Sequence, residues 1–161
     1  MAILVLGLGN TIMTDDGFGV KAVTMLSSRY RFQGPVKLLD GGTLGLDLLP
    51  YLEEIERLLI IDALDMRATP GMITRLEGED VPRAFASKLS IHQMGLQDLL
   101  AVAELQGHVP QTLVVWGVQP QSIEMGTELT PLVAAALPVV MNHVLDELRS
   151  WGIRFSSSHA S

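Results

Sequence analysis

The chain has 161 residues, of which 48% are hydrophobic and 18% are charged, and its formal net charge at pH 7 is −7. This length and composition fit one domain with a hydrophobic core and do not fit a disordered chain. The acidic balance argues against binding to a nucleic-acid backbone. The absence of cysteine excludes disulfides, thiolate metal sites and a cysteine nucleophile.

Neither a signal peptide nor a membrane span is expected from the sequence. The N-terminus has no basic region and no small-residue cleavage site. No apolar run reaches the roughly 18 residues that a membrane-spanning helix requires. We therefore expect a cytoplasmic protein that binds neither membrane nor nucleic acid.

The expected elements alternate between strands and helices along the chain. In chain order they are a strand at 2–9, a helix at 17–29, a strand at 36–40, a helix at 45–54, a strand at 57–62, an edge strand at 71–80, a helix at 95–107, a strand at 112–118 and a helix at 131–151. Gly107 has the position of a C-terminal helix cap, and Thr130 that of an N-cap. This alternation predicts a three-layer α/β/α domain over residues 1–155, followed by a polar tail at 156–161.

Acidic residues follow three of the predicted strands. They are Asp15 and Asp16 after the first, Asp40 after the second, and Asp62 with Asp65 after the third. Taken alone, Asp16 is best interpreted as a helix cap and Asp62 as a turn cap. Ligands of open α/β sheets bind beyond these strand ends, and unpaired like charges there destabilise one another. The three acidic strand ends together therefore favour a bound cation.

His92 adds an imidazole to the candidate metal ligands. A lone histidine is more often structural, but His92 lies in a predicted loop, Ser90–Gly95, just before a helix. Imidazole with two carboxylates suits a hard or borderline metal ion. The sequence contains no zinc-protease, serine-hydrolase or P-loop motif. The loop at 7–12 lacks the third glycine of a dinucleotide site, so no organic cofactor is expected.

Five sequence blocks, considered together, resemble the hydrogenase maturation endopeptidases. They are residues 7–19, 40–43, 58–65, 90–95 and 116–131, in the same order and spacing, and the resemblance extends from about residue 2 to about residue 150. It implies an endopeptidase that removes a short C-terminal extension from the nickel-loaded precursor of a nickel-iron hydrogenase large subunit. It also implies a phosphorylase/hydrolase-like α/β fold with a five-stranded mixed, mainly parallel sheet. The implied strand order is 2-1-3-5-4, with the fourth strand antiparallel.

The resemblance also implies site residues. Asp16, Asp62 and His92 match the residues that recognise nickel and take part in catalysis; members of the family have either Asp or Glu at the first of these positions. The block Asp40, Gly41, Gly42 and Thr43 matches a family motif, for which a substrate contact and a simple tight turn are equally good interpretations. Nickel is expected to come with the precursor, which is the expected partner, and the enzyme is expected to be a monomer.

Two other functions stay open at this point. One is a non-catalytic nickel-sensing chaperone that binds the precursor without cutting it. The other is a peptidyl-tRNA hydrolase-like esterase, because Gly-Leu-Gly-Asn at 7–10 also opens that family. Those esterases have a catalytic histidine soon after this opening, whereas the first histidine here is His92. The sequence also leaves open whether metal-bound water or a carboxylate acts as the base.

Overall fold

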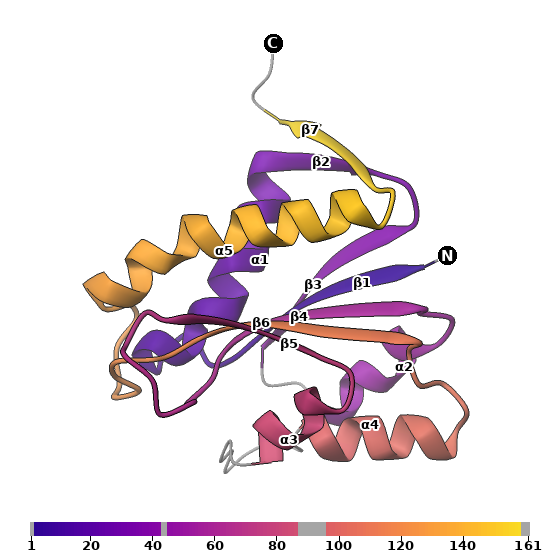
Figure 1. The fold of residues 1–161 in the computed structure, drawn as a ribbon, viewed down its shortest axis with the longest axis horizontal. Coiled ribbons are helices and arrows are strands. Elements are labelled where there is room, and N and C mark those ends of the chain that lie inside the picture. Colours follow the sequence, from indigo (N-terminus) through magenta and orange to yellow (C-terminus); the bar gives the residue numbers. More distant parts are fainter. Residues whose placement is uncertain (1, 43–44, 87–95, 159–161) are drawn as a thin grey trace.

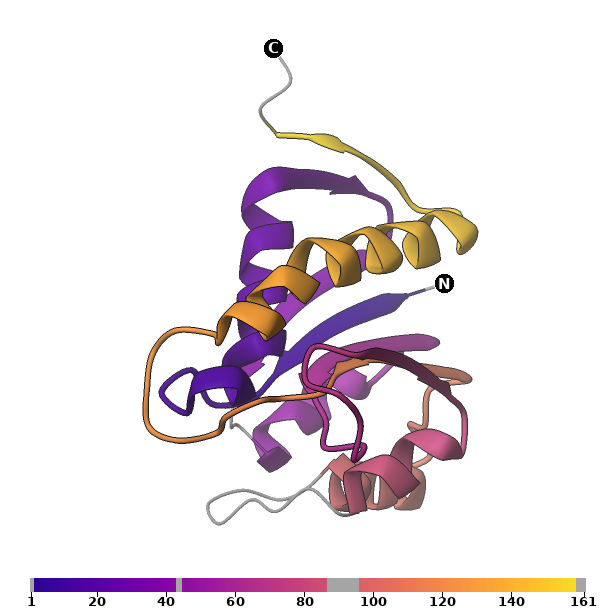
Figure 2. The same cartoon turned by 60° about the vertical axis from the view of Figure 1, so that its left-hand side comes forward.

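A computed structural model describes residues 2–42, 45–86 and 96–158, and its central sheet lies between two layers of helices (Figures 1 and 2). The sheet has five strands in the order β3-β1-β4-β6-β5. Their bounds are β1 Ile3–Leu8, β3 Val36–Gly42, β4 Arg57–Ala63, β5 Ile73–Glu77 and β6 Thr112–Val118. All neighbours pair in parallel except β5, which is antiparallel to β6. The predicted three-layer α/β fold and strand order are therefore confirmed.

Successive side chains of the central strands enter two separate cores. Ile3 and Val5 of β1 face one core, and Leu4 and Leu6 face the other, because side chains alternate along a strand. Both faces of β1 are therefore buried, as its unbroken apolar sequence predicted. Fully burying one such side chain contributes about 1.5–3 kcal/mol.

Two helices cover the first core and three cover the second (Figure 1). The first pair is α1 (Phe18–Arg29) and α5 (Pro131–Ser150), and the other three are α2 (Leu49–Leu52), α3 (Asp80–Ala86) and α4 (Leu96–Leu105). By length and composition alone α5 would pass for a membrane span, the one such helix in the described part of the chain. Eight of its residues are buried, and they pack against the sheet.

Three local differences from the sequence prediction concern short elements. The helix expected at 45–54 is a 3₁₀ turn, η2 (Gly45–Leu48), followed by α2. The strand expected at 71–80 ends at Glu77, because Gly78 has a left-handed backbone (φ +63°), and α3 begins at Asp80. Strands β2 (Tyr30–Gln33) and β7 (Arg154–Ser157) form a second, antiparallel sheet, so the segment predicted as a tail begins inside β7.

Candidate active site

The carboxyl ends of β1 and β4 lie side by side, and α1 is packed directly against them. Gly19 of α1 makes this packing possible, since a Cβ there would lie 1.9 Å from the Ile61 carbonyl oxygen. A Cβ on Gly7 of β1 would likewise lie 2.3 Å from the Gly19 carbonyl oxygen. The 3₁₀ turn η1 (Thr14–Gly17), which leads into α1, is thereby held next to the end of β4.

Gly9 is the point at which the two candidate loops meet. Its φ of +122° is strongly disfavoured for residues with a side chain. A Cβ on Gly9 would lie 1.7 Å from the Asp16 carbonyl oxygen and 3.4 Å from Asp62 Oδ1. The Asp16 backbone and the Asp62 carboxylate therefore both border one small region beside Gly9.

Asp16 is half-buried in the loop between β1 and α1. Its Oδ2 accepts a hydrogen bond from the Asn10 amide at 2.9 Å, which closes the loop of residues 10–16. The N-cap position of α1 is occupied by Gly17. The Asp16 carboxylate thus supports the shape of its loop while it is partly accessible to solvent.

Asp62 is almost completely buried at the end of β4, with 1% of its surface exposed. Its Oδ1 accepts a hydrogen bond from the Ala63 amide at 2.8 Å. Burial of a carboxylate is costly unless hydrogen bonds or positive charge compensate it. A cation bound here would compensate for the burial of this carboxylate.

Two of the predicted site residues, His92 and Thr43, lie outside the described residues. Among the described residues, no group of three or more potential metal-ligating side chains is present. Asp40 is exposed near the end of β3. Gly42 has a left-handed backbone conformation (φ +44°), and its carbonyl oxygen accepts a hydrogen bond from the Gly9 amide at 3.2 Å. Gly41 and Gly42 belong to the last residues of β3, where a Cβ on Gly41 would lie 2.6 Å from Leu6 Cδ1, so the described part of this motif packs closely against β1.

Asp15 has a structural role that its sequence position did not reveal. Its carboxylate is fully buried and accepts hydrogen bonds from the amides of Gln121, Ser122 and Thr130 at 2.8–3.0 Å, and from the Thr130 hydroxyl at 2.9 Å. Burial alone would raise the pKa of Asp15, but these hydrogen bonds outweigh it and lower the pKa below its usual value. The Thr130 side chain, predicted to cap α5, is directed to Asp15 instead.

Asp65 likewise supports the backbone around the site. Its Oδ1 accepts bonds from the Arg67 amide at 3.0 Å and from Gln119 Nε2 at 3.1 Å. These two bonds, the first being the larger effect, lower the pKa of Asp65. The Gln119 side chain also accepts from the Met66 amide at 2.7 Å, so it connects the loop after β4 to the loop after β6.

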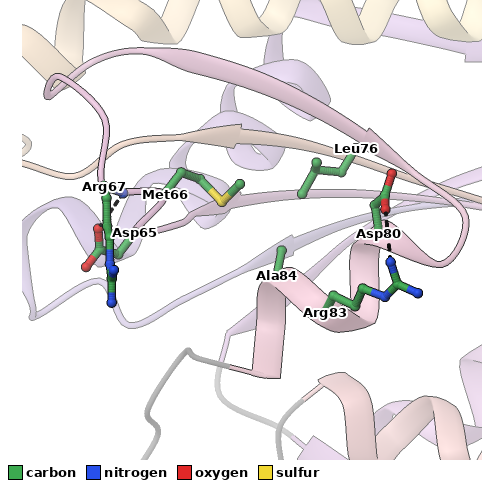
Figure 3. Close-up of a pocket in the computed structure, with 7 residues that line it drawn as sticks. All are labelled: Asp65, Met66, Arg67, Leu76, Asp80, Arg83 and Ala84. Carbon is green, nitrogen blue, oxygen red and sulfur yellow. Dashed lines mark hydrogen bonds and ion pairs between the residues drawn. The ribbon is translucent and has the colours of Figure 1, made fainter.

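A hollow of about 470 Å³ extends from the loop after β4 to α3 (Figure 3). It is lined by Asp65, Met66, Arg67, Leu76, Asp80, Arg83 and Ala84. Its acids are already engaged, Asp65 with the backbone and Asp80 with Arg83 at 4.0 Å. The hollow therefore offers a mixed polar and apolar surface beside the loop after β4.

We expect replacement of Asp15 with alanine to lower the free energy of unfolding by about 3 kcal/mol at pH 7, because three backbone amides and one hydroxyl group lose their buried, charged acceptor. The pKa of Asp15 is lower in the folded protein than in the unfolded chain, where it is near 3.8. The stabilisation by the ionised Asp15 is therefore complete at pH values above 3.8, and it is lost as the pH falls through the pKa of the folded state. Urea unfolding at neutral and acidic pH measures the difference. Asp146→Ala, at a side chain that is 70% exposed, is the control and should change stability little. An equal loss in both variants would contradict the structural role of Asp15.

Comparison with known proteins identifies the family. The family model described as "Hydrogenase maturation protease" matches residues 20–147. This chain belongs to the hydrogenase maturation protease family. It is 40% identical to the "Hydrogenase 2 maturation protease" of Escherichia coli over 154 residues, covering 95% of this chain and 94% of that protein. It is 43% identical to the "Hydrogenase expression/formation protein HupD" of Rhodobacter capsulatus, covering 94% and 73%.

The solved structures agree with this membership. The hydrogenase maturating endopeptidase HybD of Escherichia coli superposes with a TM-score of 0.94 at 39% identity, with both chains fully covered. The resemblance inferred from the five sequence blocks is thus confirmed, and so is the prediction of an endopeptidase of hydrogenase maturation. Proteases of this family process the large-subunit precursor of nickel-iron hydrogenases and recognise nickel.

Proposed function

We propose that this hydrogenase maturation protease cuts one peptide bond in the nickel-loaded precursor of a nickel-iron hydrogenase large subunit and so releases a short C-terminal extension. Family membership supports the activity. The single structural observation that supports the location is the meeting of the Asp16 loop and the Asp62 carboxylate beside Gly9. We further propose that the enzyme acts in the cytoplasm as a monomer.

The nickel ion in this proposal is part of the substrate. Asp16 and Asp62, with His92, would complete the coordination of nickel already held by the precursor's cysteine sulfurs. The chain itself has no cysteine to offer as a soft ligand. Carboxylate and imidazole groups alone do not select nickel over copper or zinc, so selectivity has to come from the precursor.

The chemical step is hydrolysis of one amide bond. A water molecule adds to the scissile carbonyl, the carbon–nitrogen bond breaks, and the released amine takes up a proton. Nickel or one of the two carboxylates activates the water. Because Asp62 is buried, an ionised carboxylate at this position would act on this step with little screening by solvent.

Incubation with a purified nickel-loaded precursor tests the proposal. The expected result is a loss of mass from the precursor equal to that of its C-terminal extension, measured by intact-mass spectrometry. A non-catalytic chaperone would form a complex with the precursor and leave its mass unchanged. That result would overturn the proposal. Hydrolysis of a peptidyl-tRNA ester by the purified protein would identify the esterase alternative instead.

A further inference from the structure

Three large apolar side chains protrude from the loops next to the candidate site. Ile12 is 53% exposed, Ile123 is 59% exposed and Met125 is 84% exposed. Ile12 lies in the loop after β1, and the other two lie in the loop after β6. Isolated exposed apolar residues are common, but a group of them at one end of a molecule is typical of a protein-binding surface. We call these three residues the apolar loop tips.

The two loops that carry the apolar loop tips are joined to each other. The Gly126 amide donates to the Ile12 carbonyl oxygen at 3.0 Å, and the Thr14 amide donates to the Gly126 carbonyl oxygen at 2.9 Å. The Thr14 hydroxyl donates to the Glu124 carbonyl oxygen. Figure 2 shows the loop after β6 running beside η1 at the same end of the sheet. The apolar loop tips therefore belong to one connected surface.

This surface is fixed before any partner arrives. The buried Asp15 carboxylate accepts hydrogen bonds from the backbone amides of Gln121, Ser122 and Thr130 and so fixes the loop after β6. Lys21 Nζ donates to the Thr127 carbonyl oxygen at 2.6 Å. A preorganised surface loses little conformational entropy on binding, which favours affinity.

Position and charge indicate the kind of partner. Asp16 lies on the same loop as Ile12, so the apolar loop tips belong to the loops that border the candidate site. The loop of residues 119–130 contains two glutamates, Glu124 and Glu128, both exposed, and no lysine or arginine. A complementary surface has an apolar depression with basic residues around it.

We propose that the apolar loop tips dock onto the folded body of the nickel-loaded precursor, in an apolar depression bordered by basic residues. This inference rests on the proposed function, because it assigns a binding surface to the same substrate. Docking here holds the body of the substrate while its extension lies at the candidate site. The surface then contributes to substrate affinity and leaves the chemical step unchanged.

The test compares two double variants with the wild type in steady-state cleavage of the nickel-loaded precursor. Ile123→Ser with Met125→Ser removes two apolar loop tips. Leu105→Ser with Val109→Ser is the matched control, since these residues are 88% and 48% exposed and lie at the last residue of α4 and in the connection that follows it. Anchors at the centre of an interface commonly change affinity about tenfold or more each. We expect KM of the first variant to rise at least about tenfold with kcat within about twofold, and both values to stay unchanged in the control.

Each other outcome has a definite meaning. If the wild type does not cut the precursor, the proposed function fails before docking is tested. If the wild type cuts it and the loop variant has an unchanged KM, or loses kcat instead, the docking proposal is overturned. An equal rise of KM in the control also overturns it. So does a change in the enzyme's own oligomeric state by sedimentation, because the surface would then bind a second copy.

Discussion

Replacing Asp62 with asparagine is expected to lower the rate of precursor processing at least about 100-fold while leaving the fold intact. Asparagine has nearly the same shape, and its side-chain oxygen can still accept the hydrogen bond from the Ala63 amide. The substitution removes the buried negative charge, and such preorganised charges are worth about two to three orders of magnitude in rate. Cleavage is followed by gel electrophoresis, and folding by the thermal unfolding midpoint.

Asp16→Asn tests the second proposed carboxylate by the same two measurements, precursor cleavage and thermal unfolding. Its side-chain oxygen can keep the bond from the Asn10 amide, so the loop should retain its shape and the protein its stability. Processing should still be lost, because the charge is gone. Asp146→Asn changes an exposed aspartate of α5 and should process the precursor normally. Normal cleavage by Asp62→Asn or Asp16→Asn would show that the altered carboxylate serves only the fold.

Precursor without nickel is expected to remain uncut at any enzyme concentration. The proposed ligand set of the enzyme is incomplete without the metal and cysteine sulfurs that the substrate brings. Purified enzyme should contain little nickel, and treatment of the enzyme alone with a chelator, followed by its removal, should not reduce activity. Nickel content is measured by mass spectrometry of the metal, and cleavage by the shift in precursor mass.

The nickel-loaded precursor is the control for that experiment and should be cut once. Zinc-loaded precursor tests whether any divalent ion suffices, since zinc binds comparable ligand sets. Efficient cleavage of metal-free precursor would contradict the role of nickel as part of the substrate. It would indicate an ordinary protease that recognises the sequence of the extension.

The elements that position the candidate site follow from local sequence. The unbroken apolar runs of β1 and β4 predict strands buried on both faces, and α1 was expected at 17–29 against an observed Phe18–Arg29. The order of the strands is not a local property. It was inferred from the family resemblance, and the pairing of β1 with both β3 and β4 confirms it.

The structural role of Asp15 could not be predicted from the sequence, in which only the family resemblance distinguished Asp16 from its neighbour. The two residues are chemically identical neighbours, and only tertiary structure decides that Asp15 is buried against the loop after β6. The pairing of β2 with β7 has the same cause, because Phe32 and Phe155, with ring centroids 5.8 Å apart, meet only in the folded chain. A signal was nevertheless present: Gln121 and Thr130 lie within the fifth family block, in which only Thr130 had a predicted role, that of a helix N-cap.

The connections of Asp15 also relate the order in which the chain is synthesised to the order in which it can fold. Its hydrogen-bond partners follow it by 106 to 115 positions, so they leave the ribosome long after the η1 turn that they hold. Until then, and until β6 has joined the sheet beside β4, the carboxylate has only water to bind. Contacts between such distant segments form late in folding. A chain that ends before residue 121 therefore lacks all of the contacts through which Asp15 holds the η1 turn.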